Sequence, residues 1–273
     1  MNRRSLSTPH IHKTLVPLMM VLSLLLPALT PNYSSAQEKD KTDKNNRKVV
    51  KKIKLKPTKD AEVIIPDFEA TFYDDGMRSV GSTINGAVDV PAPSFDFEVD
   101  LANGTYKTTQ VDLDEANLEE RSTQDGQVGT LAVPGDYVWK VRIVGKDPVF
   151  IVVNETTNRL AWRAYSNGSV AWLSYIDRCY APSPSEGNTN WFVTSCTKSA
   201  PYYPSGTVPR VRNWVDGHYI NWDWENPNIS TTVDHYISLT GFNDGTFTLD
   251  WDYHDAGEDY LYLRGTLYQC KCY

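Results

Sequence analysis

The sequence of 273 residues lacks the sequence motifs of several common enzyme classes. It contains no nucleophile elbow, no glycine-rich phosphate-binding loop and no metalloprotease helix motif. Helical periodicity is also scarce, and only Asp112 to Arg121, with acidic residues in its first turn, is predicted to form a short helix. We therefore expect no catalytic residues, no metal site and no cofactor, and a protein without enzymatic activity.

Positive charge is sparse after residue 60. Residues 1–60 carry 13 Lys and Arg against 4 Asp and Glu, whereas the remaining 213 residues carry 14 against 30. Nucleic acids and anionic lipids attract positively charged surfaces, so an acidic body is a poor partner for either. We expect no nucleic-acid partner.

Long apolar runs are missing except near the N-terminus. The stretch Leu15 to Leu29 has 15 residues, whereas a helix that crosses a bilayer needs about 20. Arg3 and Arg4 precede it and the small residues 34–36 follow it, which is the arrangement of a secretion signal. The sequence predicts a signal peptide over residues 1–36, no transmembrane anchor, and a secreted protein that is extracellular or periplasmic.

The segment 37–60 contains no aromatic residue and is rich in lysine. Its first 23 residues include ten Lys and Arg. Such a composition offers little apolar surface to bury, so it predicts a disordered basic linker. The positive charge also suggests an electrostatic tether to a negatively charged surface.

Cysteine is confined to the last hundred residues, at Cys179, Cys196, Cys270 and Cys272. Export favours disulfides over a four-thiolate zinc site. Two positions apart on a strand, Cys270 and Cys272 would have their Cα atoms roughly 6.5 to 7 Å apart, at the limit for a disulfide. We therefore expect each of them to pair with Cys179 or Cys196. The alternative is a bridge between Cys179 and Cys196, with Cys270 and Cys272 free or strained.

Apolar and polar residues alternate through much of the chain after residue 61. The pattern is clearest over 94–101, 136–143 and 246–253, and turn sequences such as Asn167-Gly168 separate the alternating runs. Alternation with a period of two is typical of strands that bury one face. The predicted fold class is all-β, built of antiparallel β-sandwiches.

The composition changes near residue 153. Residues 61–153 have the strand count of an immunoglobulin-like sandwich and contain no cysteine, whereas 154–273 hold every cysteine and seven of the eight Trp. We expect an immunoglobulin-like first domain over 61–153 and a disulfide-stapled, aromatic-rich antiparallel meander over 154–273.

Aromatic side chains next to carboxylates are the most unusual feature of the second segment. Sugar rings stack on aromatic rings, and carboxylates bind their hydroxyl groups, so this combination suggests carbohydrate recognition. Rings in loops are more accessible than rings on strands, which favours the first four residues below. The predicted ligand-binding residues are Trp191, Tyr202, Tyr203, Trp214, Trp222, Asp223, Trp224, Trp251 and Asp252.

These patterns indicate a secreted, non-enzymatic binding protein that recognises carbohydrate or a cell-surface partner. One alternative is an extracellular polysaccharide hydrolase, with carboxylate pairs such as Asp223 with Glu225 or Asp250 with Asp252 as acid and base. The other is a structural component of an envelope or matrix. Three histidines, His218, His235 and His254, fall on neighbouring predicted strands, but their spacing matches no metal-binding motif.

Overall fold

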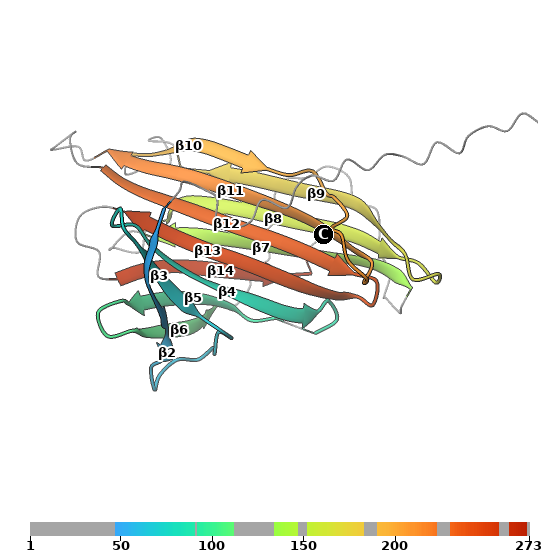
Figure 1. Cartoon of the computed structure of the whole chain (residues 1–273), viewed down its shortest axis with the longest axis horizontal. Helices are drawn as coiled ribbons and strands as arrows, with labels where there is room; N and C mark the ends of the chain where they lie inside the picture. Colours follow the sequence, from blue (N-terminus) through green and yellow to red (C-terminus); the bar gives the residue numbers. More distant parts are fainter. Residues whose placement is uncertain are drawn as a thin grey trace, which may run out of the picture. The chain divides into compact units, whose positions relative to one another are not determined.

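The computed structural model of the chain describes residues 47–90, 92–111, 134–146, 152–182, 190–222, 230–256 and 262–271. The predicted signal peptide 1–36 and the predicted helix 112–121 lie outside these ranges. Within them the regular structure consists of β-strands, arranged in two sheets (Figure 1). No helix in these ranges has the length and apolarity needed to cross a bilayer. The all-β prediction is confirmed.

Sheet A contains seven strands, and every neighbouring pair is antiparallel. In spatial order they are β1 (Val49–Lys54), β3 (Glu69–Tyr73), β4 (Arg78–Ala87), β13 (Thr246–Ala256), β12 (Ser230–Phe242), β11 (Arg210–Trp222) and β10 (Trp191–Lys198).

Sheet B also contains seven strands, antiparallel except for the short parallel pair β2 and β6. In spatial order they are β2 (Lys56–Pro57), β6 (Thr105–Val111), β5 (Ser94–Asp100), β14 (Tyr262–Cys270), β7 (Gly135–Lys146), β8 (Val152–Ala164) and β9 (Val170–Tyr180).

The alternation in the sequence decides which face of each strand is buried. Along β13 buried and half-buried residues alternate without a break from Thr246 to Ala256. The turn before it places Gly245 at a φ of 81°, a conformation that glycine adopts without steric cost. Each sheet therefore has an apolar inner face and a more polar outer face.

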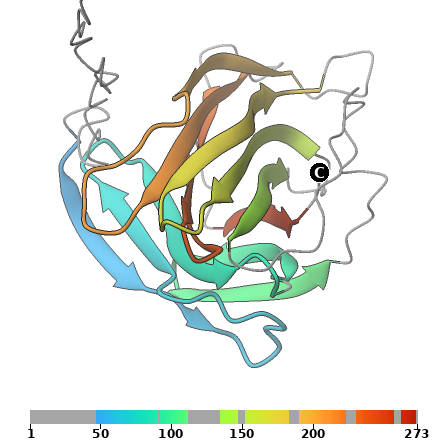
Figure 2. The same cartoon turned by 90° about the vertical axis from the view of Figure 1, so that its right-hand side faces the viewer.

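Aromatic residues from both sheets meet in one core. Trp139 of β7 stacks on Phe247 of β13 with ring centroids 4.4 Å apart, and Phe97 of β5 contacts Trp251 of β13 at 5.4 Å. Figure 2 shows the strands of the two sheets around this interior. Burying these large rings is the main source of stability in such a core.

The expected division at residue 153 is not seen. β4, from the first segment, pairs with β13, and β14, from the second, lies between β5 and β7. Neither 61–153 nor 154–273 holds a complete sheet, so the apolar faces of both segments are buried only when they fold together. The expectation of a separate immunoglobulin-like sandwich is not confirmed.

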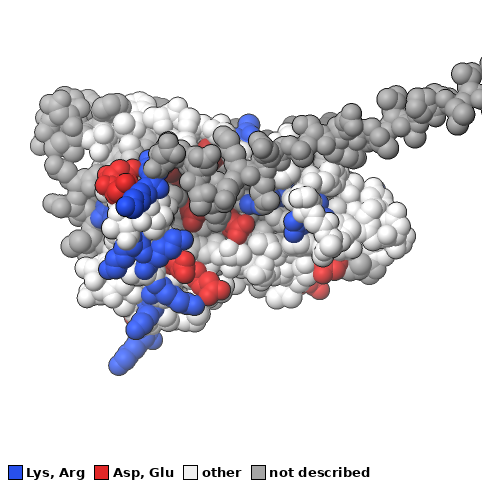
Figure 3. Space-filling model, viewed as in Figure 1, with Lys and Arg blue, Asp and Glu red and all other residues white. Residues whose placement is uncertain are grey.

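Part of the predicted disordered linker is ordered. Residues 49–54 form β1 at the edge of sheet A, and Lys56–Pro57 form β2 at the edge of sheet B. The prediction failed because Ile53 and Leu55 add apolar surface to the core, and Leu55 is only 4% exposed. The lysines of β1 remain exposed, which suits an edge strand. Figure 3 shows Lys and Arg side chains gathered over this part of the molecule.

A disulfide joins Cys179 of β9 to Cys196 of β10, with Cα atoms 5.9 Å apart. The expected pairing of these two with Cys270 and Cys272 is therefore wrong, and the alternative bridge between Cys179 and Cys196 is confirmed. The reason is topological: β7 and β8 separate β14 from β9, so Cys270 lies too far away. Cys270 is disulfide-bonded as well, and Cys272 lies outside the described residues.

Candidate ligand-binding site

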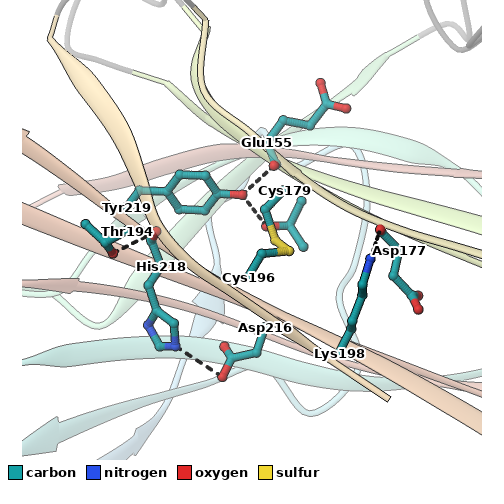
Figure 4. Close-up of a disulfide and its surroundings, with 10 residues drawn as sticks. Glu155, Asp177, Cys179, Thr194, Cys196, Lys198, Asp216, His218 and Tyr219 are labelled. Atoms are coloured by element: carbon teal, nitrogen blue, oxygen red, sulfur yellow. Dashed lines mark hydrogen bonds and ion pairs between the residues drawn. A yellow bond between two sulfur atoms is a disulfide. The ribbon is translucent and has the colours of Figure 1, made fainter. Parts of the chain in front are cut away.

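The outer face of sheet A carries a histidine between two carboxylates. His218 of β11 and Asp234 of β12 are direct partners across the two strands, and His218 Nδ1 lies 2.7 Å from Asp234 Oδ1. On the other side of the ring, His218 Nε2 lies 3.4 Å from Asp216 Oδ2, as Figure 4 shows. Asp216 precedes His218 by two residues, which places both on the same face of the strand.

These carboxylates determine the charge of the ring. Hydrogen bonds with Asp216 and Asp234 raise the pKa of His218 to about 9, although burial acts in the opposite direction. The imidazole is therefore protonated at neutral pH, and each ring nitrogen donates to a carboxylate. A protonated ring cannot accept a proton from Ser195, its cross-strand neighbour on β10. The Ser195, His218 and Asp234 set lacks the free base that a hydrolytic triad needs.

A hollow of about 460 Å³ lies over this histidine. Its size is in the range of small-molecule binding sites. Arg47 lines it from the N-terminal side and is held by an ion pair with Asp75 at 2.7 Å. The complete lining is Arg47, Met77, Thr194, Ser195, His218, Tyr219, Ile220, Thr232 and Asp234.

A second cluster lies further along the same face. Trp214 of β11 stacks against Tyr236 of β12, with ring centroids 6.3 Å apart. Arg212 Nε donates to Ser238 Oγ at 2.7 Å, and another guanidinium nitrogen lies 3.6 Å from Asp250 Oδ2. Trp214 is four residues from His218 on β11, so the two are about 14 Å apart along the strand.

The structure brings several predicted binding residues to this face. Tyr202 pairs through its backbone with Arg212, Tyr203 is 36% exposed, and Asp252 is the cross-strand partner of Tyr236. Tyr202 and Asp252 thus lie next to Arg212 and Tyr236 of the second cluster, and Tyr203 follows Tyr202 in the chain.

Two other predicted binding residues belong to the core. Trp251 has no exposed surface and packs against Phe68 and Phe97, and Trp191 is 7% exposed. The prediction failed for Trp251 because its position on β13 points inward, where the largest rings fill the space between the sheets. The side chain of Trp222 and residues Asp223 and Trp224 lie outside the described part of the chain.

Sequence reasoning also missed an exposed aromatic pair on β9. Trp172 is 43% exposed and Tyr175 is 38% exposed, with ring centroids 6.0 Å apart. A bulge opposite Ala161 and Trp162 interrupts the alternation, so residues three apart face the same side. This bulge arises from the pairing of β9 with β8, so the alternating pattern alone did not predict it.

The interior next to the disulfide is polar (Figure 4). The Tyr219 hydroxyl lies 2.6 Å from Thr156 Oγ1 and donates to the backbone oxygen of Glu155. Asn213 Nδ2 donates to Asp177 Oδ1 at 3.0 Å, and burial raises the pKa of Asp177 to about 7. This half of the interior therefore depends on hydrogen bonds as well as on apolar contacts.

The three histidines have different environments. His235 of β12 is fully buried between the rings of Tyr219 and Tyr253, and burial lowers its pKa to about 3. His254 stacks on Tyr73. Across the described ranges, no group of three or more His, Cys, Asp or Glu side chains is placed to hold a metal ion.

Comparison of the chain with protein families, with curated proteins and with solved structures finds no match. The functional argument therefore depends on the geometry of the site.

Proposed function

We propose that the protein is a secreted, non-enzymatic protein that binds carbohydrate on the outer face of sheet A. The hollow over His218 and Asp234 is the observation that supports this proposal. A disulfide between two edge strands is compatible with an oxidising location outside the cytoplasm.

The lining suits a ligand with many hydroxyl groups. Asp234 accepts hydrogen bonds and Arg47 donates them, whereas both N–H groups of His218 are already used by Asp216 and Asp234. Met77 and Ile220 offer apolar surface to the C–H groups of a sugar ring. The charged side chains of the hollow already form ion pairs, Arg47 with Asp75 and His218 with Asp234. A neutral polar ligand therefore fits better than a strongly charged one.

The aromatic cluster favours an oligosaccharide over a single sugar. Trp214 and Tyr236 form a stacked pair on the same face, and Arg212 and Asp250 flank the pair with a charged donor and a charged acceptor. A ligand that occupies the hollow and extends along β11 would reach this cluster.

Hydrolysis is less well supported by the same residues. The protonated ring of His218 lies between Asp216 and Asp234, where a sugar and an attacking water would have to fit. Asp250 already bonds to Thr83 Oγ1 at 2.6 Å.

The basic segment supports an additional electrostatic role. Lys52 and Lys54 lie on β1, an ordered edge strand with exposed lysines. We propose that these lysines contribute to a salt-sensitive tether to an anionic cell surface. Retention on a negatively charged matrix should fall as salt rises, and should fall further in Lys52→Gln.

The carbohydrate proposal is tested on a glycan array, followed by calorimetry with any glycan retained. Trp214→Ala should weaken binding by at least tenfold, because it removes one ring of the stacked pair. Trp172→Ala is the matched control, since it removes an exposed Trp from β9 of the other sheet. Retention of no glycan, or an equal loss in both variants, would contradict the proposal.

A further inference from the structure

Three polar side chains from the two sheets meet beside the disulfide, and we call them the Asp177 cluster: Asn158, Asp177 and Asn213. Asn158 of β8 is the direct cross-strand partner of Asp177 of β9. Asn213 reaches across from β11 of sheet A and donates its Nδ2 to Asp177 Oδ1 at 3.0 Å. The cluster therefore connects strands of both sheets.

Each member of the cluster has one buried oxygen without a hydrogen-bond partner. These atoms are Asn158 Oδ1, Asp177 Oδ2 and Asn213 Oδ1. Asn158 and Asn213 have no exposed surface. Buried acceptors are almost always satisfied, so three orphaned oxygens in one cluster point to a bound species that the oxygens would contact.

The orientation of the two amides is fixed by their nitrogens. Asn158 Nδ2 donates to the backbone oxygen of Ile237 at 3.3 Å, and Asn213 Nδ2 donates to Asp177. Turning either amide over would lose its hydrogen bond and place an oxygen against another oxygen. The three oxygens without partners are therefore hydrogen-bond acceptors. Each would be satisfied by a cation or by a hydrogen-bond donor.

The neighbouring cationic side chain, Lys198, forms no hydrogen bond with these three oxygens. Lys198 Nζ bonds to the backbone oxygen of Asp177 at 3.3 Å, and in Figure 4 the Asp177 carboxylate points away from it. Burial raises the pKa of the Asp177 carboxyl to about 7, so the group is mostly ionised only above that pH.

We infer that the Asp177 cluster binds a hard cation such as Ca²⁺ through these three oxygens. Carboxylate and amide oxygens are the ligands that Ca²⁺ takes, and water completes its coordination in many sites. A cation held there would tie β8 and β9 of sheet B to β11 of sheet A, two residues along β9 from the disulfide at Cys179.

The test uses the full secreted protein at pH 8.0, where the Asp177 carboxyl is ionised. Thermal unfolding is compared in EDTA and in 1 mM CaCl₂, and Tb³⁺ binding is followed by luminescence excited through the aromatic residues. Calcium should raise the unfolding temperature by several degrees. Asp177→Asn should weaken Tb³⁺ binding at least tenfold, whereas Asp89→Asn, which removes an exposed carboxylate, should bind as wild type does.

The wild-type protein keeps the test decisive if Asp177→Asn does not fold, because the calcium dependence of its unfolding temperature and its Tb³⁺ binding need no variant. The inference is overturned if calcium leaves the unfolding temperature of the wild type unchanged, or if Asp177→Asn responds to calcium as wild type does. Either result would mean that water alone satisfies the three oxygens.

Discussion

His218 Nδ1 lies 2.7 Å from Asp234 Oδ1, and the two residues are direct cross-strand partners on β11 and β12. Because Asp216 approaches the other ring nitrogen, the imidazole is held in one orientation and in one charge state at the base of the hollow. The pair thus links the fold of sheet A to the electrostatics of the proposed ligand site.

Replacement of Asp234 by Asn should lower the pKa of His218 from about 9 by one unit or more, because the ring loses a negative partner. The pKa is measured from the NMR titration of the ring protons. The raised pKa stabilises the folded state fully below the unfolded value of about 6.5, and this stabilisation is lost as the pH rises through 9. The variant should therefore lose more stability at pH 6 than at pH 10, by about 1 to 2 kcal/mol after solvent screening.

Asp89→Asn serves as the control for that titration, since Asp89 is exposed and lies outside the hollow. An unchanged pKa of His218 in Asp234→Asn would show that Asp216 alone sets the charge of the ring.

Acid should destabilise the protein through His235. Its pKa of about 3 in the folded state lies below the unfolded value, so the unfolded chain binds the proton first as the pH falls. Stability should fall by about 1.4 kcal/mol per pH unit between pH 6.5 and 3 from this group. His235→Phe keeps a ring between Tyr219 and Tyr253 and should remove about 2 to 3 kcal/mol of the loss at pH 4.5. Urea unfolding at pH 7.5 and 4.5 measures both values, and an equal acid sensitivity in the variant would contradict the assignment.

Removing the staple should destabilise the folded state without changing its strands. The disulfide closes a separation of 17 residues, for which loop-closure entropy predicts about 3 kcal/mol. The double variant Cys179→Ser and Cys196→Ser should lose about that free energy of unfolding in guanidinium titrations, with an unchanged circular dichroism spectrum. Ser195→Ala, next to Cys196 and outside the bridge, should have a free energy of unfolding close to that of wild type. A similar loss in this control would contradict the proposed contribution of the disulfide.

The strands were predictable because burial of one face produces an alternation of apolar and polar residues in the sequence. Phe247, Leu249 and Trp251 alternate with polar residues, and the structure buries all three. Alternation does not reveal which strands pair, however, so the pairing of β13 with β4, and the position of β14 between β5 and β7, could not be derived. β1 was not predicted because its lysine-rich composition indicated a disordered linker, although Ile53 packs against the core.

The site was less predictable than the fold. A local pattern shows that Trp214 lies on a polar face, but it does not show that Tyr236 stacks on it from the next strand. The charge of His218 depends on Asp234, 16 residues away, and the hollow depends on Arg47, more than 170 residues away. These relationships arise only from strand register and from the approach of the N-terminal segment.

The placement of β14 affects the order in which the chain can fold. This strand, Tyr262–Cys270, lies between β5 and β7, so sheet B remains two disconnected halves until residue 270 has been synthesised. A chain shortened before residue 262 would lack the strand that connects these halves. Completion of sheet B therefore requires the synthesis of β14.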